Sequence, residues 1–281
     1  MRMLSQLEAI AIEAGKLISQ YRASGPSVVQ KSDGSPVTNA DEAAEALILR
    51  ELHKLAPGIP IIAEEATASG AIDPVSCGAV FLVDPLDGTK EFIRGRDDFT
   101  VNICLVENRR PKLGVVFAPA RHELFSGDGS ASYRCRLAQD ASIVERVTIR
   151  SRCSPDKLTA VASASHAGVE TDEFLQTLPV DRKISVGSSL KFCLVAAADA
   201  HIYPRFGRTM QWDTAAGDAV LRGAGGCTLT RDGEELEYGV LRANGTFDNP
   251  YFVSYGGHAD VLRALMAAPA LRPAEPAVFQ D

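Results

Sequence analysis

Residues 84–89 (Asp-Pro-Leu-Asp-Gly-Thr) place two carboxylates on a short turn that contains a proline. The hydrophobic run before them, residues 78–83, predicts a buried strand that ends at Asp84. Mg²⁺ is a hard ion that prefers octahedral oxygen coordination at about 2.0–2.1 Å and often keeps waters and substrate phosphate among its ligands. Asp84 and Asp87, with the Leu86 carbonyl as a neutral ligand, could supply such oxygens. The turn is therefore a candidate magnesium site.

The next two residues could bind a phosphate beside that metal. Gly88 lets the backbone approach a ligand closely, and Thr89 could begin a helix whose unpaired amides point at an anion. The competing interpretation is an ordinary polar turn in which Asp87 caps the helix, and for an isolated pattern of this kind it is the favoured one. The segment alone therefore leaves both interpretations open.

Two further acidic positions lie at the ends of predicted elements. Glu64 and Glu65 follow the apolar residues 59–63, and Asp213 precedes the helical pattern of residues 214–222. Taken singly, the glutamates could form a solvated loop pair, and Asp213 could be an N-cap that contributes about 0.5–2 kcal/mol. Asp41, which lies near Thr38 at the start of another predicted helix, could likewise stabilise a helix terminus.

Other common catalytic patterns are missing from the sequence. The five histidines form no H-E-x-x-H, and neither G-x-S-x-G nor G-x-x-x-x-G-K-[ST] occurs. The acidic turn also lacks the glycine and distal glutamate positions of an EF-hand. These absences argue against histidine-centred nucleophilic chemistry and against a P-loop NTPase.

Composition narrows the class of protein further. The chain has 281 residues, of which 46% are hydrophobic and 23% charged, which is ordinary for a globular protein. A net charge of -7 argues against binding of a nucleic-acid polymer, which needs clustered Lys and Arg, but allows a small anionic substrate. The six scattered cysteines show no zinc spacing, so we expect reduced, mostly packed thiols.

The hydrophobic pattern predicts no transmembrane segment. The first 21 residues mix charged and apolar positions at helical spacing, and no run of about 18 apolar residues occurs. We therefore expect a cytoplasmic protein and leave open a peripheral association with the inner face of the membrane. The sequence does not indicate an oligomeric state.

The periodicity predicts the elements that must position these residues. Expected helices span residues 3–22, 40–55, 189–199 and 213–222, and expected strands span residues 78–83, 99–106, 113–117, 159–163 and 183–186. A soft boundary near residue 150 would divide an N-terminal α+β domain, residues 1–150, with most metal ligands from a C-terminal α/β domain, residues 151–281, with the substrate-binding segments and Asp213. The Ala/Pro-rich tail after Met266 is expected to be partly disordered.

The ordered segments AEE, DPLDGT and WDTAAGDA resemble the inositol monophosphatase superfamily of magnesium-dependent, lithium-sensitive phosphatases. Within it, KSDGSPVTNAD, VDPLDGTKEFI, VGSSLKFCLVAAADA and YPRFGRTMQWDTAAGDAV are similar to the CysQ-like branch, the 3'(2'),5'-bisphosphate nucleotidases. The resemblance spans roughly residues 5–245. It departs at Ala63, where glycine is common, and at Asp218, where an added negative charge puts the fine substrate preference in doubt.

This resemblance implies a layered αβαβα sandwich of mixed α+β and α/β character. It also implies two or three Mg²⁺ ions and a small phosphorylated nucleotide as substrate. The ligands it assigns to the metals are Glu64, Asp84, the Leu86 carbonyl, Asp87 and Asp213. Several of these residues would also contact the substrate, namely Glu64, Leu86, Asp87 and Asp213.

The same resemblance implies the other roles in the reaction. Asp41 and Thr89, with Glu64, would position and deprotonate the attacking water, and the amides of Gly88 and Thr89 would receive the phosphate that is cleaved. Ser188, Lys191 and Arg205 would bind the second phosphate of a bisphosphate nucleotide. Without the resemblance, a lone Lys or Arg is more simply read as a solvated surface residue.

The expected reaction is hydrolysis of adenosine 3',5'-bisphosphate to AMP and phosphate, and the sulfated analogue PAPS is a second candidate substrate. An inositol or sugar phosphatase is an alternative within the same class of enzyme. A noncatalytic nucleotide or metal sensor is an alternative of another class.

Overall fold

The computed structural model describes residues 2–31, 34–68, 78–153, 157–163 and 168–267. Its helices are α1 (Arg2–Ser24), α2 (Asn39–Leu55), α3 (Glu64–Ala68), α4 (Thr89–Ile93), α5 (Val169–Gln176), α6 (Leu190–Ala196), α7 (Gln211–Gly223) and α8 (Ala259–Met266), with a 3₁₀ turn, η1, at Pro119–Arg121. Among the described residues, none of these helices is both long enough and apolar enough to span a lipid bilayer.

The strands form two large sheets and one short hairpin. The seven-stranded sheet has the order β3-β4-β5-β6-β7-β8-β9, and the five-stranded sheet has the order β11-β10-β12-β14-β13. The first sheet contains β3 (Ile61–Ala63), β4 (Ala79–Asp87), β5 (Thr100–Glu107), β6 (Arg110–Ala118), β7 (Glu123–Gly127), β8 (Ser132–Leu137) and β9 (Ile143–Ile149). The second contains β10 (Leu158–Ser163), β11 (Val180–Val186), β12 (Ile202–Arg205), β13 (Cys227–Thr230) and β14 (Phe252–Tyr255), and β1 (Val28–Gln30) pairs with β2 (Pro36–Thr38).

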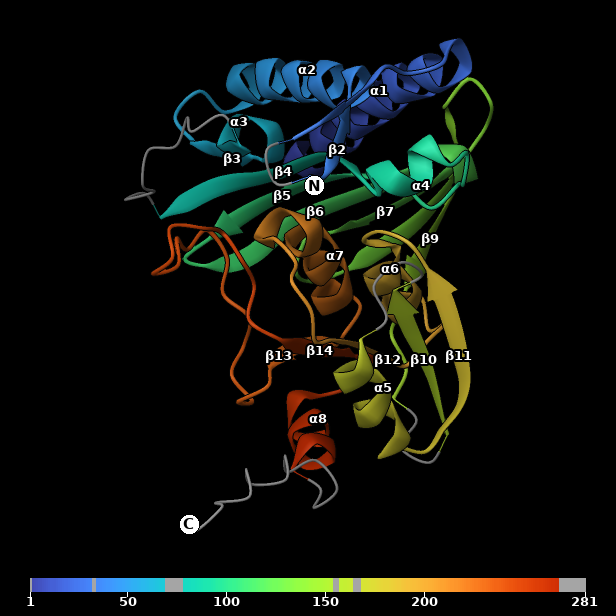
Figure 1. Ribbon diagram of the computed structural model, residues 1–281, viewed down its shortest axis with the longest axis vertical. Coiled ribbons are helices and arrows are strands. Elements are labelled where there is room, and N and C mark those ends of the chain that lie inside the picture. Colours follow the sequence, from blue (N-terminus) through green and yellow to red (C-terminus); the bar gives the residue numbers. More distant parts are fainter. Residues whose placement is uncertain (1, 32–33, 69–77, 154–156, 164–167, 268–281) are drawn as a thin grey trace, which may run out of the picture.

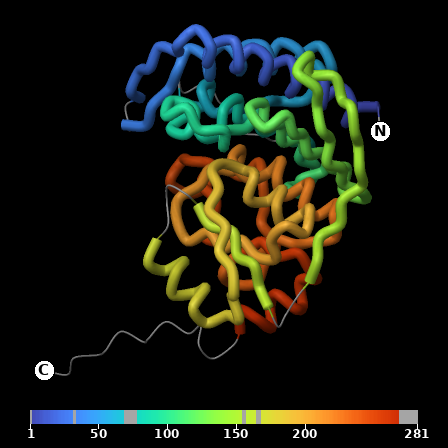
Figure 2. Tube along the Cα trace, turned by 90° about the vertical axis from the view of Figure 1, so that its right-hand side faces the viewer, coloured from blue at the N-terminus to red at the C-terminus, as the bar shows by residue number. Residues whose placement is uncertain are grey.

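The two sheets and the helices stack in five layers, as Figure 1 shows. Helices α1 and α2 cover the outer face of the first sheet, α6 and α7 lie between the sheets, and α5 and α8 cover the far face of the second sheet. Figure 2, turned by 90°, shows the same stacking, with α1 and α2 (blue) at one end of the molecule. The expected αβαβα sandwich is thus confirmed.

Three hydrophobic cores lie between these layers, and the sequence pattern of β5 explains two of them. Val101, Ile103 and Leu105 face the core under α1 and α2, whereas Cys104 and Val106 face the core that contains α6 and α7. Because both faces of this strand are buried, its sequence is nearly continuously apolar instead of alternating. Such a strand anchors the layers on each side of it.

Most of the predicted elements are confirmed, with shifts at their ends. Helices α1, α2 and α7 match the expected ranges within two residues at each end, whereas the expected helix over residues 189–199 is shorter and ends at Ala196. The prediction that the strand before the acidic turn ends at Asp84 is wrong, because β4 continues to Asp87. The Ala/Pro-rich tail from residue 268 lies outside the described residues.

The boundary expected near residue 150 falls between β9, the last strand of the first sheet, and β10, the first strand of the second. Helix α7 belongs to the second half of the chain but packs against the first sheet. A Cβ atom added at Gly114 of β6 would lie 2.4 Å from the Ala216 carbonyl oxygen of α7. A division into two domains therefore stays a prediction.

The cysteine prediction is confirmed for the residues described. All five described cysteines are free, with Cys104, Cys135 and Cys193 buried and Cys153 exposed. Cys77 lies outside the described residues.

Candidate active site

A cavity of about 460 Å³ lies where residues of the two sheets and of the middle helices, α6 and α7, meet. It collects residues from the ends of β4 and β12 and from the starts of α3, α4, α6 and α7. Every residue predicted to bind metal or substrate lines it, namely Glu64, Asp84, Leu86, Asp87, Gly88, Thr89, Ser188, Lys191, Arg205 and Asp213. The structure thus brings together residues that are up to 149 positions apart (from 64 to 213) in the chain.

An irregularity in β4 explains how Asp84 and Asp87 reach the same cavity. In a regular strand, residues three apart point to opposite faces of the sheet. Here Asp84 pairs with Asn102 and Asp87 with Thr100, so β4 carries one residue more than β5 between these pairs, as in a β-bulge. The Leu86 amide donates to the Asp84 carboxylate at 3.0 Å, which fixes the turn.

The carboxyl groups of this cavity are electrostatically unfavourable to one another. Burial, followed by repulsion from Glu64, Asp87 and Asp213, raises the pKa of Asp84 well above its usual value. The pKa of Asp213 is likewise raised well above its usual value, by burial and by Asp87 and Glu64. Burial raises the pKa of Asp87 to about 6, although the Lys191 charge and the Ser189 amide oppose the shift.

Helix α7 holds Asp213 through its own backbone. The helix begins at Gln211, so Asp213 is its third residue and not the residue before it, and its carboxylate accepts from the Met210 amide at 2.8 Å. Asp213 is therefore not the N-cap that the simple interpretation expected, because Met210 holds that position. Asp213 lies in the first turn of the helix and supplies the side-chain contact of a capping box. The remaining carboxylate oxygen is not used in that contact.

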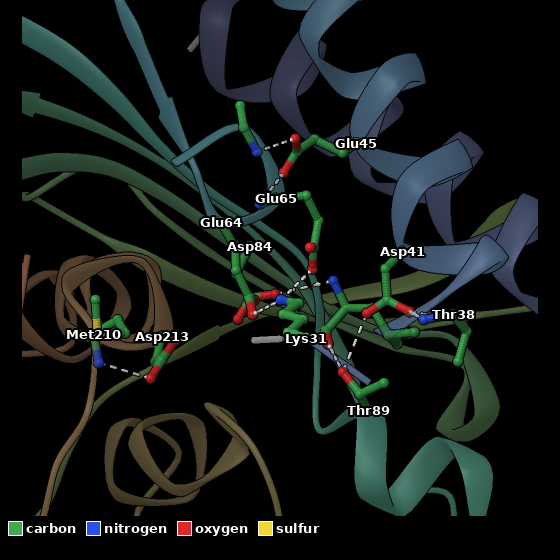
Figure 3. A network of polar contacts seen from close by, with 12 residues as sticks. Lys31, Thr38, Asp41, Glu45, Glu64, Glu65, Asp84, Thr89, Met210 and Asp213 are labelled. Carbon is green, nitrogen blue, oxygen red and sulfur yellow. Dashed lines mark hydrogen bonds and ion pairs between the residues drawn. The ribbon is translucent and has the colours of Figure 1, made fainter. Parts of the chain in front are cut away.

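Glu64 and Glu65 begin α3 directly after β3, and Lys31 lies between them (Figure 3). The Lys31 ammonium is 2.8 Å from Glu64 Oε1 and 2.7 Å from Glu65 Oε1. Burial lowers the pKa of Lys31, but the charges and hydrogen bonds of the two glutamates raise it by a larger amount. The pKa of Lys31 is therefore raised above its usual value. Glu45 of α2 accepts from the Glu65 and Ala66 amides at 2.8 Å each. Glu64 and Glu65 are therefore an anchored pair, so the solvated-loop interpretation is wrong.

The donor set suits a hard divalent cation. The candidate ligands are all oxygen atoms, most of them carboxylates that are repelled by their neighbours, and a bound cation would relieve that repulsion. As the side chains lie, no three His, Cys, Asp or Glu residues within the described ranges are grouped closely enough to hold an ion together. The cationic group beside Glu64 is the Lys31 ammonium, so an ion bound by Glu64 would compete with Lys31 for the same oxygen.

Asp41 connects the start of α2 to Thr89. One carboxylate oxygen accepts from the Thr38 amide at 2.9 Å and from the Thr38 hydroxyl at 2.6 Å, which completes a capping box at α2. The other oxygen accepts from the Thr89 hydroxyl at 3.1 Å. Burial raises the pKa of Asp41, although the contacts with Thr38 oppose this. Asp41 therefore caps a helix, as the simple interpretation expected, and also holds the Thr89 hydroxyl (Figure 3).

The surface interpretation of Lys191 and Arg205 is wrong, because both are buried, with exposed fractions of 6% and 9%. Lys191 donates to the Ser188 carbonyl, lies 5.5 Å from the centre of the Tyr203 ring, and has a pKa lowered to about 8, mainly by burial. Arg205 donates to the Arg208 carbonyl at 2.8 Å. Within the described part of the chain, neither Arg205 Nε nor Ser188 Oγ has a hydrogen-bond partner, although both atoms are buried.

Asp218 does not line this cavity. It is fully buried on α7, where its carboxylate accepts from Arg222 Nε at 2.9 Å and from the Tyr238 hydroxyl at 3.1 Å. Its charge is therefore paired inside the protein. The concern that it alters substrate preference finds no support in this arrangement.

Sequence reasoning missed several residues that shape the site. Lys31 and Ser189 contact candidate ligands, and Glu45 accepts from the two amides that follow Glu64 in the chain. Trp212 and Tyr203 line the cavity. Lys31 and Ser189 lie inside segments that carry the family resemblance, which was the available signal. Nothing in the local sequence marks Glu45, because it is one of several acidic residues on an amphipathic helix.

Comparison with known proteins agrees with this geometry. Residues 2–262 match the model of the inositol monophosphatase family. The chain is 42% identical over 238 residues to the 3'(2'),5'-bisphosphate nucleotidase CysQ of Shigella flexneri, covering 84% of this chain and 94% of the relative. It is 35% identical over 255 residues to the protein of the same name from Buchnera aphidicola, covering 90% and 94%.

Solved structures give the same result. CysQ from Bacteroides thetaiotaomicron, described as a bacterial member of the inositol monophosphatase family, superposes with a TM-score of 0.77 at 33% identity, covering 92% of this chain and 98% of that one. The inositol monophosphatase of Thermotoga maritima superposes with a TM-score of 0.73 at 25% identity, covering 94% and 97%. With its five-layered sandwich and its acidic cavity, this chain belongs to the inositol monophosphatase family.

Proposed function

We propose that this protein is a magnesium-dependent phosphatase that converts adenosine 3',5'-bisphosphate to AMP and inorganic phosphate. The observation that carries the proposal is one cavity that combines a cluster of carboxylates with two buried donors lacking protein partners in the described residues, Ser188 Oγ and Arg205 Nε. The names of the relatives from Shigella flexneri and Buchnera aphidicola support the same substrate class. The sulfated analogue PAPS is a second candidate substrate.

In this proposal the carboxylates hold the metal. Glu64, Asp84, the Leu86 carbonyl, Asp87 and Asp213 would bind two or three Mg²⁺ ions in the cavity. When bound, Mg²⁺ makes water more acidic and stabilises negative charge on the leaving oxygen. The raised pKa values of Asp84 and Asp213 fit this role, because a neighbouring cation favours their charged forms.

Thr89 and Asp41 would orient the attacking water. Because the Thr89 hydroxyl donates to Asp41, its oxygen lone pairs are available to accept a hydrogen bond from water. As the water oxygen bonds to phosphorus and the bond to the ribose 3'-oxygen breaks, a water proton would pass to Thr89 Oγ1 while Thr89 gives its own proton to Asp41. The released ribose 3'-oxygen would take up a proton from solvent water, which gives the 3'-hydroxyl of AMP. Glu64 would help to hold the water on the side away from the leaving group.

Two sets of donors would bind the two phosphates. The amides of Gly88 and Thr89 would receive the phosphate that is cleaved, since Gly88 adopts a φ of +92° and brings the backbone to the cavity. Ser188, Lys191 and Arg205 would bind the 5'-phosphate, for which a cationic group and hydrogen-bond donors are suitable. An inositol monophosphate has no second phosphate and would leave these donors unused.

The test compares phosphate release from adenosine 3',5'-bisphosphate, inositol 1-phosphate and fructose 1,6-bisphosphate, each with and without Mg²⁺. We expect the highest kcat/KM for the nucleotide and no turnover without the metal. Preference for either of the other substrates would favour the inositol or sugar phosphatase. Binding of the nucleotide without any turnover would favour a noncatalytic sensor.

Asp87→Asn tests the metal assignment separately. The amide is a weaker and uncharged ligand, so Mg²⁺ affinity and kcat should fall together, by about 10- to 100-fold or more. A fully active variant would contradict the assignment. Glu51→Gln, on the outer surface of α2, is the matched control, because Glu51 pairs only with Arg50 and Lys54 among the contacts the structure records for it.

A further inference from the structure

Two glycine turns of the site meet at the backbone of Asp98, the residue two positions before β5. A Cβ atom added at Gly88 would lie 2.8 Å from the Asp98 carbonyl oxygen, and one added at Gly187 would also lie 2.8 Å from it. Both distances are too short for a side chain. Asp98 is therefore in close contact with the turn that carries Thr89 and with the turn that carries Ser188.

The Asp98 side chain ties the second of these turns to the first half of the molecule. Its Oδ2 accepts from the Gly187 amide at 3.2 Å, and its Oδ1 accepts from Arg121 in η1. The side chain is only 21% exposed, so these contacts are partly shielded from water. An amide of the second half of the chain is thereby fixed to a carboxylate of the first.

The other end of the same turn is tied down as well. The Ser189 amide donates to Asp87 Oδ2 at 2.6 Å, and the Ser189 hydroxyl donates to Asn102 Oδ1 at 2.7 Å. Ser189 is buried, with 2% of its surface exposed. Residues 187 and 189 are thus both held by side chains of β4, of β5 or of the segment that connects these two strands of the first sheet.

Ser188, between these two tethers, adopts the left-handed backbone conformation, with a φ of +52°. Residues other than glycine rarely adopt this conformation, and they keep it only where the surroundings impose it. It places Ser188 on the cavity wall, with its carbonyl accepting from Lys191 Nζ and its buried Oγ free of any partner among the described residues. The tethers therefore set the positions of two donors, Ser188 Oγ and the Lys191 ammonium.

We infer that Asp98 is a positioning residue for substrate recognition, which holds the Gly187 amide so that Ser188 and Lys191 are preformed to bind the second phosphate. The inference rests on the proposed function, because only a bisphosphate uses these donors. Asp98 itself does not line the cavity, so its effect must pass through Ser188 and Lys191. It should therefore change KM for a bisphosphate and leave the chemical step nearly unchanged.

The test measures kcat and KM for adenosine 3',5'-bisphosphate and for adenosine 3'-monophosphate, which lacks the second phosphate. Asp98→Ala should raise KM for the bisphosphate about tenfold, with kcat within about twofold and KM for the monophosphate unchanged. Asp98→Asn keeps one acceptor oxygen for Gly187 and should stay within about twofold of the wild type for both substrates. An equal loss for the two substrates, or a loss confined to kcat, would overturn the inference.

The neighbouring Asp97→Asn is the matched control. Asp97 is 61% exposed and pairs with Arg22, so its loss should leave both substrates unaffected. If Asp98→Ala does not fold, the same KM comparison is made with Asp98→Glu. That variant keeps a negative charge for Arg121 but moves the carboxylate oxygen away from the Gly187 amide. Thermal unfolding of each variant identifies a general loss of stability.

A double variant tests the route through Ser188. A glycine at position 188 adopts a positive φ without any tether and has no hydroxyl. In the Ser188→Gly variant, Asp98→Ala should therefore raise KM for the bisphosphate by less than about threefold. Full additivity of the two changes would contradict the inference. Wild-type protein that shows no preference for the bisphosphate would instead contradict the proposed function, so the two failures are distinguishable.

Discussion

The single O–H group of Thr89 lies within hydrogen-bond distance of two acceptors that share its proton, Asp41 Oδ1 and the Leu86 carbonyl, each at 3.1 Å. Leu86 belongs to the acidic turn, whereas Asp41 lies in the first turn of α2 (Figure 3). The hydroxyl therefore joins the candidate metal site to the base that would accept the proton. Its role can be separated from helix capping, because Thr38, and not Thr89, caps α2.

Thr89→Val removes this hydroxyl while keeping the shape of the side chain. We expect kcat to fall by about 10²- to 10⁴-fold, the usual contribution of a positioned proton-transfer group. KM should change little, because the Gly88 and Thr89 amides are retained. Steady-state kinetics with adenosine 3',5'-bisphosphate measure both constants.

Thr89→Ser is the control for that prediction, since it keeps the hydroxyl and should retain most of the activity. Asp41→Asn should lower kcat and also the melting temperature, because Asp41 accepts from Thr38 at the start of α2. A Thr89→Val enzyme with wild-type kcat would exclude this hydroxyl from the reaction.

At the scale of elements, the bulge in β4 and the glycine turn after it place the acidic residues. Local sequence predicts the strand and the turn, but periodicity alone could not reveal that Asp84 and Asp87 share one cavity, because the extra residue in β4 is defined only by its pairing with β5. Strand β9 was missed for a different reason. β9 is exposed over six of its seven residues, so it shows no buried face that a pattern could detect.

Gly88→Ala should damage the turn in two ways. The left-handed φ of +92° is unfavourable for alanine, and the new methyl group would lie 2.8 Å from the Asp98 carbonyl oxygen. We expect the free energy of unfolding to fall by about 2 kcal/mol or more, measured by chemical denaturation, with a large loss of kcat/KM.

Gly58→Ala provides the comparison for that variant. Gly58 lies between α2 and β3, and a Cβ atom there would meet nothing within 4 Å. Its substitution should change the free energy of unfolding by less than about 1 kcal/mol. Equal effects of the two substitutions would show that neither the strain nor the close contact at Gly88 matters.

At the scale of the whole molecule, the five layers bring Glu64 and Asp84 from one half of the chain together with Asp213 from the other. Composition and periodicity could not predict this meeting, because it depends on α7 packing against the first sheet. The family resemblance did predict it. Neither approach could predict the contacts made by Asp98 and Ser189, since they join residues about 90 positions apart.

This convergence of acidic groups should make the metal-free protein less stable as the pH rises. Asp87 has a pKa raised to about 6 and Glu65 one raised to about 7, each mainly by burial, against about 4 in the unfolded chain. Between about pH 4 and about pH 7, the folded state holds protons on these carboxyl groups that the unfolded state has lost. The free energy of unfolding therefore falls as the pH increases through this range. In EDTA, we expect a lower melting temperature at pH 8 than at pH 5.

Mg²⁺ should reverse that loss, and more strongly at pH 8 than at pH 5, because the carboxylates must be ionised to bind it. For a chain of this length, each kcal/mol of stabilisation raises the melting temperature by about 2–4 °C. Asp213→Asn removes one buried charge, so the metal-free variant should melt higher than the wild type at pH 8 and respond less to Mg²⁺. A wild-type melting temperature that is unchanged by Mg²⁺ at pH 8 would contradict the idea that repulsion among these groups is relieved by a bound cation.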